Sequence, residues 1–82
     1  MARTKTIYDP KYKSFINEMV RIRKEKGLTQ RDLAKMLGEA HVLIGTIELR
    51  SRRVDVLETY KILKALGLSK SEISKLLEKY FY

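Results

Sequence analysis

Three capping boxes divide this chain of 82 residues into short helices. In a capping box, a residue just before a helix and an acidic residue three positions later each accept a hydrogen bond from the other's backbone N–H. The pairs are Thr29 with Asp32, Asp55 with Glu58, and Ser69 with Glu72. Glycine often follows the last residue of a helix. Glycines stand at positions 27, 38 and 67, where three of these helices would end. These signals predict several short helices joined by tight turns.

The apolar residues within each segment recur at helical spacing. Asp9 and Pro10 open a first helix that Gly27 closes, and a third helix begins near Ala40, which offers no side-chain acceptor for a cap. No segment alternates with a period of two, and no Asn-Gly or Asp-Gly turn occurs. We therefore expect an all-α fold: a compact domain of five helices, the last running from Ser69 to the C-terminus.

The residue types present exclude several kinds of chemistry. The chain has no cysteine and one histidine, His41, so it cannot form disulfides, thiolate metal sites or a catalytic histidine pair. No apolar run approaches the roughly 20 residues that span a bilayer. We expect no enzyme activity, metal, cofactor or membrane partner. The lack of cysteine favours a cytoplasmic location.

The net charge of +8 meets the first criterion for a nucleic-acid-binding protein, because Lys and Arg neutralise phosphates. Solubility or an acidic protein partner would explain the same charge. Residues 1–26 carry eight basic and three acidic side chains, so the excess is concentrated there. We interpret residues 1–8 as a flexible basic arm and residues 9–82 as one domain.

The second and third helices are short and meet at Gly38, which is the helix-turn-helix arrangement. The run IRKEKGLTQRDLAKMLG, followed by IGTIE, RR and LKALGLS, resembles the Xre-like family of lambda-repressor and Cro type. The resemblance covers about residues 12–79, and its most specific part is GLTQRDLAKMLG with Glu48 ten residues beyond Gly38. It implies a compact five-helix, lambda-repressor-like domain that binds a double-stranded DNA operator as a homodimer, with the third helix in the major groove. We expect a transcription regulator, a repressor, at the nucleoid.

The resemblance and the basic residues nearby together indicate which residues hold phosphates. Gln30 matches a glutamine that clamps a phosphate and braces the third helix, and a helix N-terminus attracts anions; a surface residue that merely favours helix is the alternative. Glu48 matches a structural glutamate, which we expect to orient the arginines that follow it. The expected phosphate contacts are Gln30, Arg31, Arg50, Arg52 and Arg53. The family's usual glycine after the third helix is Arg50 here, which leaves the form of that turn open.

The outward face of the third helix would read the bases. It carries His41, Val42, Gly45, Thr46 and Leu49. Only His41 and Thr46 can hydrogen-bond a base edge, so thymine methyl contacts by Val42 and a close backbone approach at Gly45 would have to contribute. Alternatively, Val42, Leu43 and Leu49 dock a protein, as in the antitoxin of a toxin pair. The intact phosphate-binding set favours base reading by His41, Val42, Gly45 and Thr46.

The C-terminal helix carries an apolar stripe that ends in three aromatic residues. Chain ends are normally polar, so this stripe predicts a surface that a second copy covers, although it could also close the core. The residues that we expect at this dimer interface are Ile73, Leu76, Leu77, Tyr80, Phe81 and Tyr82.

Overall fold

The computed structural model describes residues 9–81 and is all-α within this range. Its five helices are α1 (Pro10–Glu25), α2 (Gln30–Leu37), α3 (His41–Glu48), α4 (Val56–Ala65) and α5 (Lys70–Phe81). The five-helix fold predicted from caps and periodicity is therefore confirmed. The arm assigned to residues 1–8 and the interface residue Tyr82 lie outside the described residues. Over the described range, no helix is both long enough and apolar enough to cross a membrane.

All three capping boxes form. At α2, Thr29 Oγ1 accepts from the backbone N of Asp32 at 3.0 Å, and the Asp32 carboxylate accepts from the backbone N of Thr29 at 2.9 Å. The same reciprocal bonds begin α4 and α5. At α3, by contrast, Ala40 makes no side-chain cap. The position of α3 must therefore depend on the contacts that it makes with other helices.

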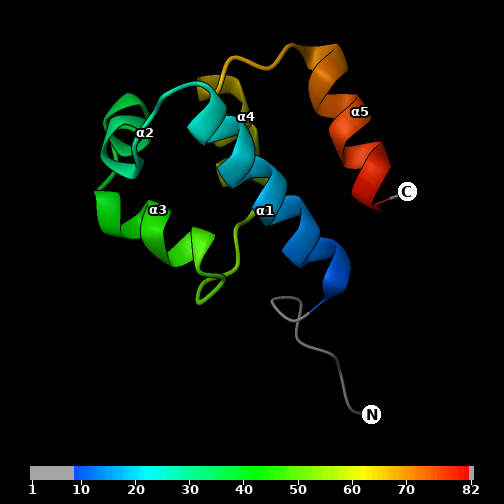
Figure 1. The fold of residues 1–82 in the computed structure, drawn as a ribbon, viewed down its shortest axis with the longest axis horizontal. Coiled ribbons are helices and arrows are strands. Elements are labelled where there is room, and N and C mark those ends of the chain that lie inside the picture. Colours follow the sequence, from blue (N-terminus) through cyan, green and yellow to red (C-terminus); the bar gives the residue numbers. More distant parts are fainter. Residues whose placement is uncertain (1–8, 82) are drawn as a thin grey trace.

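A left-handed residue turns the chain between α2 and α3. Gly38 ends α2 with a φ of 70°, and its N–H bonds back to the carbonyls of Ala34 and Lys35. A side chain at this position would clash with the following carbonyl, which is why glycine is favoured. The turn lays α3 against α2 and α1, and α2 also contacts α4 (Figure 1).

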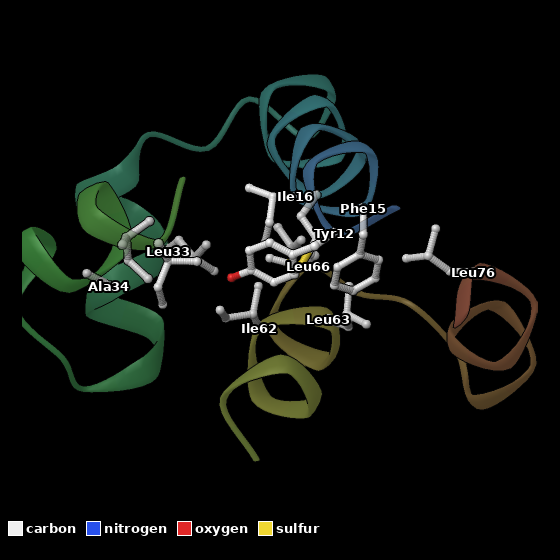
Figure 2. Packing of buried hydrophobic residues seen from close by; sticks show 12 residues of the cluster. Tyr12, Phe15, Ile16, Leu33, Ala34, Ile62, Leu63, Leu66 and Leu76 are labelled. Carbon is white, nitrogen blue, oxygen red and sulfur yellow. The ribbon is translucent and has the colours of Figure 1, made fainter. Parts of the chain in front are cut away.

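The core runs from α2 and α3, between α1 and α4, to α5. Figure 2 shows Phe15 of α1 between Leu63 of α4 and Leu76 of α5, with Leu33 of α2 on the opposite side of the cluster. The Phe15 ring also meets two α5 rings edge to face, with centroid distances of 6.2 Å to Tyr80 and 5.1 Å to Phe81. Phe15 thus attaches α5 to the rest of the domain.

Candidate nucleic-acid interface

A buried ion pair joins α1 to the end of α3. Arg23 is only 6% exposed. Its Nε and Nη2 donate to the Glu48 carboxylate at 2.7 and 2.9 Å, and its Nη1 donates to the Leu28 carbonyl at 2.7 Å. Glu48 is structural, as expected, but its expected role in orienting the loop arginines is wrong. It faces inward, because the buried guanidinium of Arg23 is the stronger partner for its charge.

Gln30 braces α3 from the start of α2. Its Nε2 donates to Glu48 Oε1 at 2.9 Å. Its Oε1 would lie 3.4 Å from a Cβ added at Gly45, which is an ordinary van der Waals contact with the end of a flexible side chain. Gly45 is half-buried and faces α2. Packing against Gln30 therefore does not by itself require glycine here, and the base-reading role of Gly45 stays a prediction.

The outer face of α3 begins with two exposed side chains, and Leu49, just after the helix, is also exposed. His41 is exposed, and Val42 is 63% exposed. Thr46 is half-buried, and its hydroxyl donates to the Leu43 carbonyl at 2.9 Å. Because that proton is used within the helix, the Thr46 hydroxyl can only accept a hydrogen bond from a base. On this face, His41 is thus the side chain that can donate a hydrogen bond to a base, and Val42 is the side chain that can make an apolar contact with one.

An open hollow of about 520 Å³ lies at the start of α2, and Gln30, Arg31 and His41 all line it. The capping box uses the N–H groups of Thr29 and Asp32, which leaves the amides of Gln30 and Arg31 for an anion. The Thr29 N–H holds the pKa of the Asp32 carboxyl below its ordinary value, so this group is charged at neutral pH. Arg31 is exposed and adds a positive charge at this helix N-terminus.

The loop between α3 and α4 carries three arginines in three different settings. Arg50 is half-buried, whereas Arg52 and Arg53 are exposed. The Nη1 and Nη2 atoms of Arg52 donate to the Glu58 carboxylate at 2.9 and 2.7 Å, and this guanidinium lowers the pKa of Glu58. Arginine has five N–H donors, so Glu58 can hold Arg52 in place and leave donors for a phosphate.

The helix-turn-helix at α2 and α3 can be compared with known proteins. A family model described as helix-turn-helix matches residues 20–78. This chain belongs to the XRE family of helix-turn-helix proteins. A solved structure of an XRE-family like protein from Pseudomonas syringae pv. tomato str. DC3000 is 28% identical, with a TM-score of 0.78 over 90% of this chain and 92% of that chain. Among curated proteins, none matches.

The XRE family is a family of DNA-binding transcription regulators, so the DNA-binding class expected from the sequence is confirmed. The described helix-turn-helix brings Gln30, Arg31 and His41 together at one hollow. The three loop arginines follow the other end of α3. Which of these residues contact DNA stays a prediction.

Arg50 takes the left-handed conformation that an XRE-type glycine would favour. Its φ is 59°, and Arg50 is the non-glycine residue with a positive φ among residues 9–81. The turn whose form the sequence did not determine is therefore a left-handed one, with an arginine in the strained position. A side chain in this conformation costs about 1–2 kcal/mol.

Replacing Arg50 with glycine should raise the midpoint of thermal unfolding by about 4–8 °C, because relief of the strain exceeds the extra entropy of glycine by about 1 kcal/mol. It should also weaken binding to any DNA, since a cation is lost. Arg50→Ala is the matched control: it removes the cation and keeps the strain. A lower midpoint for Arg50→Gly than for Arg50→Ala would contradict the strain.

The residues assigned to a dimer interface on α5 divide into two groups. Leu76 is buried, and Tyr80 is half-buried, with its hydroxyl donating to Glu18 Oε1 at 2.9 Å. Ile73 is also half-buried. Leu77 and Phe81 remain 38% and 47% exposed. Of the described residues assigned to the interface, Leu77 and Phe81 are thus the two that keep the most accessible surface for a partner.

Two residues with clear roles in this region were not identified from the sequence. Arg23 continues the stripe of Ile16 and Met19 at helical spacing, so a charged residue on an otherwise buried face was the available signal. Glu58 was interpreted only as a capping residue. Its second function, holding Arg52, depends on a loop conformation that the spacing does not predict.

Proposed function

We propose that this XRE-family protein is a sequence-specific transcription regulator that binds a symmetric operator as a homodimer, with α3 in the major groove. Repression is its simplest action, because occupancy of an operator that overlaps a promoter is sufficient. Such a regulator would act in the cytoplasm, at the nucleoid.

The observation that carries the proposal is that possible phosphate contacts lie near both ends of α3. The start of α2, with Gln30 and Arg31, shares a hollow with His41. The exposed loop arginines, Arg52 and Arg53, follow the other end of α3. Phosphate contacts near both ends of a helix fix its register in the major groove, where its exposed side chains can reach base edges.

A second candidate function is a protein-interaction module, such as an antitoxin. Val42 on α3 and Leu49, the residue just after this helix, are 63% and 76% exposed. Exposed apolar side chains of this size also suit a protein surface. The DNA experiment below separates the two functions.

We expect His41→Ala and Val42→Ala to weaken binding to the operator more than binding to random DNA, by roughly 5-fold to 100-fold, because base contacts carry discrimination. Thr46→Val, which keeps a methyl group and removes the hydroxyl, should have a smaller effect. The Val42 effect should map to a thymine. Selection of binding sites from a randomised DNA library, with each variant and the wild type, measures these preferences.

Arg31→Ala and Arg53→Ala are the matched controls. They should weaken binding to operator and random DNA equally, and each should reduce the slope of log affinity against log salt by about 1. If His41→Ala and Val42→Ala keep the wild-type sequence preference, α3 does not read bases. Loss of capture of a purified toxin on changing Leu49 would then favour the antitoxin function.

A further inference from the structure

An apolar groove of about 390 Å³ lies between the start of α4 and the end of α5. Tyr12, Phe15 and Leu63 are buried residues that line it. On its α4 side, Val56 and Tyr60 are 88% and 53% exposed. Its α5 side carries Leu77 and Phe81, which are also exposed. The α5 side of this groove was expected from the sequence as an interface, whereas its α4 side was not.

Several polar groups along the groove already have hydrogen-bond partners within the chain. The Thr59 hydroxyl donates to the Asp55 carbonyl at 2.8 Å, and the Asp55 carboxylate accepts from the backbone N of Glu58 at 2.7 Å. The Tyr12 hydroxyl accepts from the backbone N of Val54 at 3.0 Å. Small-molecule sites keep a few polar groups to orient their ligand. The engagement of these groups instead favours the apolar side chains of a protein partner.

The two edges of the groove have matching geometry. Val56 and Tyr60 are four residues apart on α4, and Leu77 and Phe81 are four residues apart on α5, so each pair forms a short apolar ridge along its helix. The same surface therefore carries both a ridge and a groove. In a two-fold dimer the same surface of each copy contacts the other, so it must be complementary to itself, with the ridge of one copy in the groove of the other.

We propose that the groove seats the exposed Leu77 and Phe81 ridge of a second copy of this chain, with Val56 and Tyr60 as the α4 half of the interface. This inference rests on the proposed function and specifies the surface through which the regulator dimerises. A stable interface covers about 800 Å² on each partner, which is roughly one seventh of the 5905 Å² accessible surface of this chain. An interface of that size would extend beyond the groove along both helices.

The proposed interface adjoins the loop that carries the DNA-facing arginines. Arg53 and Val54 line the groove, and the Val54 N–H is bound by Tyr12. A partner seated in the groove would therefore contact the loop directly. Dimerisation would hold the loop arginines in position while it places two α3 helices on one operator.

Val56→Glu tests the interface without disturbing the fold. Val56 is the first residue of α4, is 88% exposed, and occupies a position where an acidic residue favours the helix. We expect the full chain to sediment as a dimer and Val56→Glu to raise the dimer dissociation constant by about 100-fold or more, since each interface would bury two carboxylates in an apolar surface. Binding to a symmetric operator should weaken, while binding to a single half-site should stay near wild type.

Leu57→Glu is the matched control, because Leu57 is the next residue, is 58% exposed, and lines a different hollow against α2 and α3. It should remain dimeric. A Val56→Glu protein that stays dimeric would overturn the inference and leave the proposed function standing. A wild-type chain that stays monomeric at about 100 μM, or that binds no DNA, would instead contradict the proposed function itself, so the two failures are distinguishable.

Discussion

Replacing Glu48 with alanine should lower the free energy of unfolding by about 3–5 kcal/mol, because it leaves the Arg23 guanidinium buried without a counter-charge. The side chains of this pair are 7% and 10% exposed, so water cannot replace the lost carboxylate. Gln30 would lose its acceptor as well. The loss is a large part of the 5–15 kcal/mol that is typical of a small domain. Urea unfolding followed by circular dichroism measures it.

Glu25→Ala is the control for this experiment. Glu25 also pairs with an arginine, Arg21, but both side chains are more than half exposed. An exposed pair contributes about 0–1 kcal/mol, so the control should unfold almost as the wild type does. The double variant Arg23→Met, Glu48→Leu should recover most of the stability, because apolar residues can replace a buried pair. A cost for Glu48→Ala as small as that for Glu25→Ala would contradict the buried ion pair.

Phe15→Ala should be the other large change, with a loss of about 3–5 kcal/mol for a buried aromatic ring. Phe15 is 2% exposed and meets Tyr80 and Phe81 of α5. The cavity would therefore loosen α5 more than α2 and α3. Amide hydrogen exchange should accelerate most along α5, measured at a denaturant concentration where the variant is still folded.

Met36→Ala provides the comparison. It also removes a long apolar side chain, but Met36 is 54% exposed on α2 and should change stability by about 0.5 kcal/mol or less. Uniform acceleration of exchange across all five helices in Phe15→Ala would show that α5 has no separate dependence on Phe15. In that case the role given to Phe15 in attaching α5 would be wrong.

The helices could be predicted because their signals are local. Thr29, Asp55 and Ser69 each form the expected capping bonds with an acidic residue three positions later. Gly38 has the expected left-handed conformation. These features depend on residues within one turn of each other, so the sequence contains all the information that they require.

The site could be predicted only in part, because its contacts join distant residues. Arg23 and Glu48 are 25 positions apart, and no local rule matches one buried charge with the other. The expectation for Glu48 failed because it considered only the neighbouring arginines. Similarly, the α4 half of the groove depends on how α4 and α5 lie across Phe15. Val56 looks like an ordinary first-turn residue in the sequence.

The inward anchoring of α3 also affects how such a regulator could diverge. Glu48 and Gln30 hold the helix from its inner side, and the exposed side chains His41 and Val42 take no part in that anchoring. A duplicated gene could therefore exchange these two residues and acquire a new operator while the domain keeps its stability. New specificities would thus arise mainly at the start of α3.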